Sequence, residues 1–126
     1  MIRIVYNIGN RLLSEAITRA LKDSGNFRLF PVETKHLTTA DCVGPEPDIL
    51  FLDVACGEGT SVKERLELLK KVKAVLPKCK TVLLVDENSQ PEAAHEVMLL
   101  KQSGQIDAFF HSSVTGNYLA AALEAI

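Results

Sequence analysis

The chain has 126 residues, which is the size of one domain and too short for two. Hydrophobic residues make up 47% and charged residues 24%, a globular composition that excludes a disordered chain. The net charge of −2 and the lack of a basic run argue against direct nucleic-acid binding, and no apolar run approaches the roughly 20 residues of a membrane span. We expect a cytoplasmic protein without a signal peptide, whose three cysteines are reduced thiols rather than metal ligands.

Five short apolar runs alternate with five amphipathic stretches. The apolar runs lie at residues 2–6, 27–32, 49–52, 81–85 and 106–110. The third and fourth are nearly continuous, as in strands buried on both faces of a parallel sheet. Helical periodicity follows each run. The expected helices extend from Leu12 to a stop at Gly25, over 34–42, from Val62 to Leu76, from Ser89 to Gly104, and from about Thr115 to Ile126.

Two of these helices have start signals that can be tested. Ser89 is expected to cap the fourth helix, with Pro91 in its first turn and Glu92 completing a capping box. The segment 57–61 before the third helix has the position of an anion cradle but lacks the phosphate-loop pattern, so we interpret it as a turn with Thr60 or Ser61 as the cap. Charges of both signs between Lys63 and Lys73 indicate a solvated helix face.

A strand followed by a helix, five times over, predicts an α/β domain with helices on both faces of a parallel sheet. Right-handed crossovers favour the three-layer, doubly wound, flavodoxin-like (βα)5 fold with strand order 2-1-3-4-5. We predict a single domain over residues 1–126. The apolar final helix suggests that this domain is the N-terminal part of a longer regulator.

Polar residues close four of the predicted strands. Asn7, Asp53, Asp86 and His111 stand at the carboxyl ends, where open parallel sheets bind ligands. An acidic residue that ends a buried apolar run is not explained by packing, because ionised carboxylates avoid burial unless paired. We therefore predict a pocket formed by these four residues. Alternatively, Asp86 caps its own loop near Ser89, His111 is a surface residue, or the two form an ion pair sensitive to pH.

The segment PDILFLDV at residues 47–54 resembles the phospho-acceptor stretch of response-regulator receiver domains. The segment RLLSEAI (11–17) resembles the first helix of the subfamily that carries a C-terminal helix-turn-helix, and GQIDAFFH (104–111) resembles the fifth-strand segment of the family as a whole. The resemblance covers essentially the whole chain. It implies the receiver fold of two-component signalling, with Asp53 at the position that accepts a phosphoryl group from a sensor histidine kinase.

Several positions depart from that family's pattern. The acidic pair that holds Mg²⁺ aligns with Ile8 and Gly9, the phosphate-binding lysine with His111, and the hydroxyl residue after strand four with Asp86. An isoleucine cannot coordinate Mg²⁺, so any metal at Asp53 would be held weakly. We interpret the chain as a receiver-like module with a degenerate pocket, in which phosphorylation is weak or absent.

The resemblance implies no enzymatic activity and an output through a homodimer, or a DNA-binding effector, on the face made by helix four, strand five and helix five. This segment itself is not expected to touch nucleic acid or membrane. The alternative function is an interaction or small-ligand-sensing module of the same fold that never uses phosphorylation. A flavin-binding enzyme is a third hypothesis, although residues 7–10 have one glycine and no run of hydroxyls for a flavin phosphate.

Overall fold

The computed structural model describes residues 1–55 and 59–126, and it contains five strands and five helices that alternate along the chain. The strands form one parallel sheet in the order β2-β1-β3-β4-β5, which confirms the predicted fold class and topology. The elements are β1 (Ile2–Asn7), α1 (Arg11–Ser24), β2 (Phe27–Pro31), α2 (Thr39–Val43), β3 (Ile49–Asp53), α3 (Val62–Val75), β4 (Lys80–Val85), α4 (Pro91–Gln102), β5 (Ala108–His111) and α5 (Gly116–Ala125).

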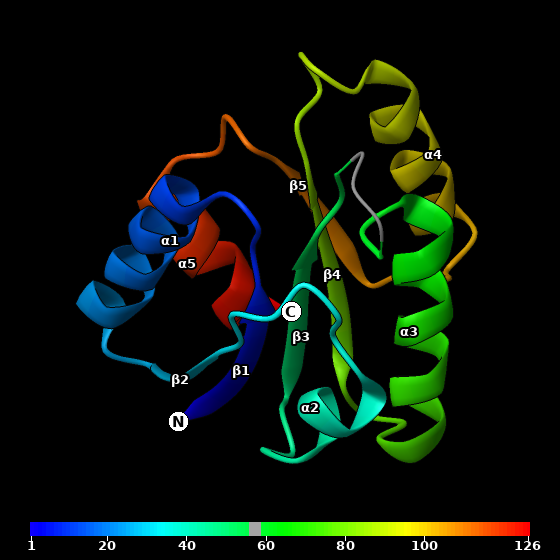
Figure 1. Ribbon diagram of the computed structural model, residues 1–126. Helices are drawn as coiled ribbons and strands as arrows, with labels where there is room; N and C mark the ends of the chain where they lie inside the picture. Colours follow the sequence, from blue (N-terminus) through cyan, green and yellow to red (C-terminus); the bar gives the residue numbers. More distant parts are fainter. Residues whose placement is uncertain (56–58) are drawn as a thin grey trace.

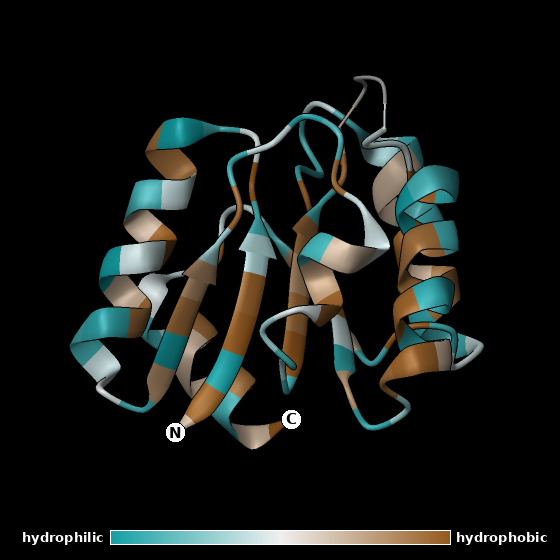
Figure 2. Cartoon of the chain, turned by 60° about the horizontal axis from the view of Figure 1, so that its bottom comes forward, coloured by the Kyte–Doolittle hydropathy of each residue, from teal (hydrophilic) through white to brown (hydrophobic). Residues whose placement is uncertain are grey.

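The sheet separates two hydrophobic cores. Helices α1 and α5 cover one face, while α2, α3 and α4 cover the other (Figure 1). The strands are hydrophobic along most of their length and the helices turn hydrophilic residues outward (Figure 2). All five residues of β3 are buried, as expected for the central strand of a doubly wound sheet. This arrangement places the ends of β1 and β3 side by side at the carboxyl edge.

Glycine sets the geometry of the α1/α5 layer at two places. Gly25 ends α1 with a φ of 74°, a left-handed conformation that favours glycine. A Cβ atom added to Gly116, the first residue of α5, would lie 2.9 Å from the Cβ of Ala20. The absence of a side chain therefore lets α5 pack closely against α1.

Two helix starts differ from the sequence prediction, and a third agrees with it. The second helix begins only at Thr39, because Thr38 and Asp41 form a capping box there. The fourth helix has Pro91 in its first turn as predicted, but its N-cap is Gln90 with no side-chain cap hydrogen bond, so Ser89 does not cap it. Ser61 does cap α3, as one of the two predicted candidates.

Strand β5 starts two residues later than predicted, and Asp107, the residue just before it, is a side-chain acceptor. Its carboxylate accepts hydrogen bonds from the backbone N–H of Thr81 at 2.8 Å and from the Lys73 Nζ at 2.8 Å. Burial alone would raise the pKa of Asp107, but the hydrogen bonds from Lys73 and Thr81 outweigh it and lower that pKa. The group ties α3, β4 and the start of β5 together at the amino edge of the sheet.

The two cysteines in the described part of the chain are buried thiols of low reactivity. Cys42 and Cys79 are free and buried, and burial raises the pKa of their thiols to about 12 and about 11. Thiols with such pKa values are poor nucleophiles and metal ligands at neutral pH. Cys56 and the residues Gly57 and Glu58 of the predicted turn lie outside the described residues.

Candidate functional site

Two of the four predicted site residues lie together at the carboxyl edge of the sheet. Asn7 ends β1 and Asp53 ends the neighbouring strand β3, where Asn7 is in register with Leu52. Both side chains are largely buried, with 7% of Asn7 and 9% of Asp53 exposed. Because buried polar groups require partners, their neighbours decide what this edge can do.

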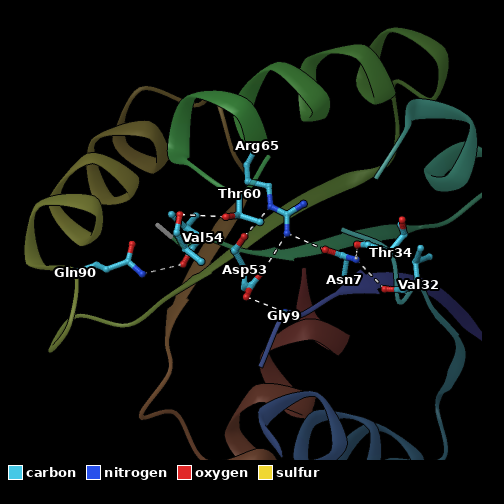
Figure 3. A network of polar contacts seen from close by, with 10 residues as sticks. Asn7, Gly9, Val32, Thr34, Asp53, Val54, Thr60, Arg65 and Gln90 are labelled. Carbon is cyan, nitrogen blue, oxygen red and sulfur yellow. Dashed lines mark hydrogen bonds and ion pairs between the residues drawn. The ribbon is translucent and has the colours of Figure 1, made fainter. Parts of the chain in front are cut away.

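The partner of both residues is Arg65, from the first turn of α3 (Figure 3). Its Nη2 donates to the Oδ1 of Asn7 at 2.8 Å and to the Oδ1 of Asp53 at 2.9 Å, and its Nε donates to the main-chain oxygen of Asp53 at 2.8 Å. Only 2% of Arg65 is exposed. The guanidinium and the carboxylate thus form a buried ion pair within the protein.

The remaining side-chain polar atoms of Asn7 and Asp53 are also occupied. The second carboxylate oxygen of Asp53 accepts a hydrogen bond from the backbone N–H of Gly9 at 3.0 Å. The amide nitrogen of Asn7 donates to the carbonyl oxygens of Val32 at 2.8 Å and Thr34 at 3.0 Å. The Asn7–Asp53–Arg65 cluster therefore links β1, β3, α3 and the segment after β2, and its side chains carry no net charge.

The prediction of a fully solvated charged face on α3 was wrong at Arg65. A sequence signal for its burial exists, because Val62, Arg65, Leu69 and Val72 follow the three- and four-residue spacing of one helix face, and all four are buried. A lone basic residue on an apolar stripe indicates a buried cation with an acidic partner. The charges around Arg65 in the sequence obscured that pattern.

Asp86 caps its own loop, which is one of the alternatives that the sequence indicated. Its Oδ1 accepts hydrogen bonds from the backbone N–H groups of Asn88 at 3.0 Å and Ser89 at 3.4 Å. The hydrogen bond from Asn88, followed by those from Ser89 and Ser112, lowers the pKa of Asp86. No hydrogen bond or ion pair within residues 1–55 and 59–126 joins Asp86 to Asp53.

His111 is paired with Glu87 rather than with Asp86. Its Nδ1 lies 3.5 Å from the Oε2 of Glu87, and 45% of its side chain is exposed. The other oxygen of Glu87 accepts a hydrogen bond from the hydroxyl of Ser113 at 2.9 Å. The hypothesis of an Asp86–His111 ion pair was therefore wrong, because Glu87, one residue further along the loop, reaches the imidazole instead.

With Arg65 in place, the described residues at this edge do not fit a divalent cation. The positions after β1 that would need carboxylates are occupied by Ile8, which is buried, and Gly9. Within the described ranges, no group of three or more histidine, cysteine or acidic side chains could hold a metal. The oxygen atoms of Asn7 and Asp53 that could face a cation instead accept hydrogen bonds from Arg65.

Comparison with known proteins identifies the fold. No protein-family model and no curated protein sequence matches the chain. Among solved structures, a CheY-like response-regulator receiver domain from Methanospirillum hungatei superposes with a TM-score of 0.72 at 13% identity, covering 99% of this chain and 92% of that one. A two-component response regulator from Clostridium difficile gives 0.69 at 16% identity, covering 99% and 94%.

A Burkholderia thailandensis protein described as a pilus assembly protein is similarly close, with a TM-score of 0.69 at 18% identity, covering 99% of this chain and 97% of that one. The chain therefore has the CheY-like receiver fold, as its sequence resemblance predicted. None of the helices in the described segments is both long and apolar enough to span a membrane.

Proposed function

We propose that this domain is a receiver-like signalling module that works through protein contacts and does not use phosphorylation of Asp53. One observation carries the proposal: both carboxylate oxygens of Asp53 are already bound within the protein, one by Arg65 and one by the backbone of Gly9. Each hydrogen bond engages a lone pair of one oxygen and draws electron density from it, so the carboxylate is a weaker nucleophile toward a phosphorus atom. The buried cluster therefore favours the phosphorylation-independent function over control by a histidine kinase.

The charge balance at the carboxyl edge supports the same conclusion. Arg65 and Asp53 neutralise each other. A phosphoryl group would add a charge of about −1.5 to −2. Phosphoryl transfer depends mainly on positioning and on cations that neutralise this charge. His111, which aligns with the family's phosphate-binding lysine, lies beside Glu87 and, within the described residues, forms no hydrogen bond or ion pair with Asp53 that would compensate for this charge.

The proposed output surface is the face around the edge strand β5. Helices α4 and α5 lie on opposite sides of the sheet beside it, and each carries an exposed large apolar side chain, with Leu99 46% and Tyr118 63% exposed. Exposed apolar side chains of this size are typical of contact surfaces. We propose that a second copy of the chain, or an effector domain that binds DNA, docks there, and that the domain works in the cytoplasm without enzymatic activity.

The test is an amide NMR titration of the wild-type domain with Mg²⁺ and beryllofluoride, a mimic of the phosphoryl group. We expect no shift of the amides of Gly9, Asp53 or Val54. The Asp53→Ala variant is the matched control, and a conventional receiver domain in the same buffer confirms that the reagent is active. Saturable shifts that occur in the wild type and vanish in Asp53→Ala would show that the proposal is wrong.

A further inference from the structure

The Arg65 guanidinium lies where oxygen atoms from two strands converge. A single nitrogen, Nη2, is within 2.9 Å of one side-chain oxygen from β1 and one from β3, while Nε holds the main-chain oxygen of Asp53. We propose that Arg65 is a built-in cation that replaces a divalent metal ion at Asn7 and Asp53 and excludes metal from this edge. The inference rests on the proposed function, because a built-in cation explains how Asp53 stays paired in a domain that does not use phosphorylation.

The chemistry of the acceptors supports this assignment. The three oxygens come from an amide, a carboxylate and a main-chain carbonyl, which are the oxygen types that Mg²⁺ and Ca²⁺ bind in proteins. The 2.8–2.9 Å from the guanidinium nitrogens to these oxygens are ordinary N–H···O hydrogen-bond lengths, and Mg²⁺ in the same place would have to draw the oxygens in to about 2.0–2.1 Å. The cluster therefore has the donor set of a weak cation site and the spacing of a guanidinium complex.

Displacement of Arg65 by a metal ion is disfavoured by its surroundings. Arg65 is 2% exposed, and Val62 and Leu69, its neighbours on the same face of α3, are buried. An incoming ion would have to break three hydrogen bonds and eject a guanidinium that has no second acidic partner nearby in the described residues. The built-in cation thus needs no metal supply and cannot be removed by a chelator.

The experiment measures paramagnetic broadening of the Gly9 amide by Mn²⁺, because Gly9 donates to Asp53 and so reports on that carboxylate. It compares the wild type with Arg65→Met, with Lys63→Met and with the double variant Asp53→Asn/Arg65→Met. Lys63 is exposed on the same helix, so its substitution removes one positive charge without touching the cluster. In Arg65→Met we expect binding with a Kd on the order of 10⁻³ M, the weak end for oxygen-ligand sites.

At a Mn²⁺ concentration near that Kd, broadening at Gly9 should be at least about tenfold greater in Arg65→Met than in the wild type or Lys63→Met, and it should vanish in the double variant. If Arg65→Met does not fold alone, saturating Mn²⁺ or Mg²⁺ should fold it, since metal binding to the native state favours folding. Either result supports the inference.

Site-specific broadening of Gly9 in the wild type would overturn the inference, and so would an Arg65→Met variant that shows no binding or stays unfolded with metal. These failures are separate from failure of the proposed function. A wild type that binds Mn²⁺ but ignores beryllofluoride would reject only the built-in cation, whereas a wild type that takes up beryllofluoride would reject the phosphorylation-independent function.

Discussion

Replacement of Arg65 by methionine should strongly destabilise the domain. Methionine keeps much of the length and apolar contact of the side chain but removes the charge and the three hydrogen bonds to Asn7 and Asp53. The Asp53 carboxylate, whose side chain is 13% exposed, would then be left without its cation in a site that water reaches poorly. An uncompensated buried charge is among the most damaging changes a protein core can suffer.

The size of the effect can be worked out in two ways. At about 4 Å between charge centres and an effective dielectric constant near 20, the ion-pair attraction is about 4 kcal/mol. Removal of one partner of a buried pair is known to cost about 3–5 kcal/mol. Domains of this size have unfolding free energies of about 5–15 kcal/mol, so Arg65→Met should lose about a fifth or more of its stability and about 10–20 °C in Tm.

Urea denaturation followed by far-ultraviolet circular dichroism measures this loss. Lys63→Met, which removes a charge from an exposed position on the same helix, should change stability by less than about 0.5 kcal/mol. The double variant Asp53→Asn/Arg65→Met should recover at least half of the loss, because no unpaired charge remains. An Arg65→Met variant within about 1 kcal/mol of the wild type would refute the ion pair as a main support of this edge.

Three further outcomes follow from other parts of the fold. In a Cys56→Ser background, Cys42 and Cys79 should resist iodoacetamide at pH 8 and react once urea unfolds the chain, because burial raises the pKa of both thiols; rapid labelling of the native protein would contradict this. Asp107→Asn should lose about 1–2 kcal/mol at pH 7. Because the pKa of Asp107 is lowered in the folded state, its contribution to stability is present above its ordinary pKa and is lost as pH falls through the lowered pKa. Urea denaturation at pH 7 and pH 3 should therefore show that the stability difference between Asp107→Asn and the wild type shrinks at pH 3. A stability difference that does not depend on pH would count against this role of Asp107. Gly25→Ala should raise the free energy of the folded state by about 1 kcal/mol because alanine disfavours a φ of 74°, and an unchanged melting temperature would argue against that strain.

The fold could be predicted well from the sequence because the patterns that indicate strands and helices are local. Apolar runs and helical stripes repeat five times, and the handedness of crossovers leaves few ways to order five parallel strands. The boundaries that failed were those where a side chain overrides periodicity. The carboxylate of Asp107 accepts hydrogen bonds from Thr81 and Lys73 just before β5 begins, and the Thr38–Asp41 capping box sets the start of α2.

The candidate site was predicted only in part, because its decisive contact joins residues far apart in the chain. Strand ends located Asn7 and Asp53, but their partner lies 58 residues after Asn7 and 12 after Asp53. The mixed charges on α3 predicted a solvated helix face, whereas the burial of Arg65 depends on which face of the helix packs against the sheet. The partner of His111 was missed for a similar reason, since loop residues such as Glu87 follow no periodic pattern that would predict where their side chains point.

Glu87 has a consequence for how contacts on this side of the domain communicate. Its carboxylate binds Ser113 through one oxygen and lies 3.5 Å from the His111 imidazole through the other, so it bridges the loop before α4 and the loop before α5. A molecule that repositions one loop must stretch or break these contacts and thereby changes the energy of the other. Binding at α4 and binding at α5 should therefore be thermodynamically coupled, and by reciprocity each would alter the affinity of the other by the same factor.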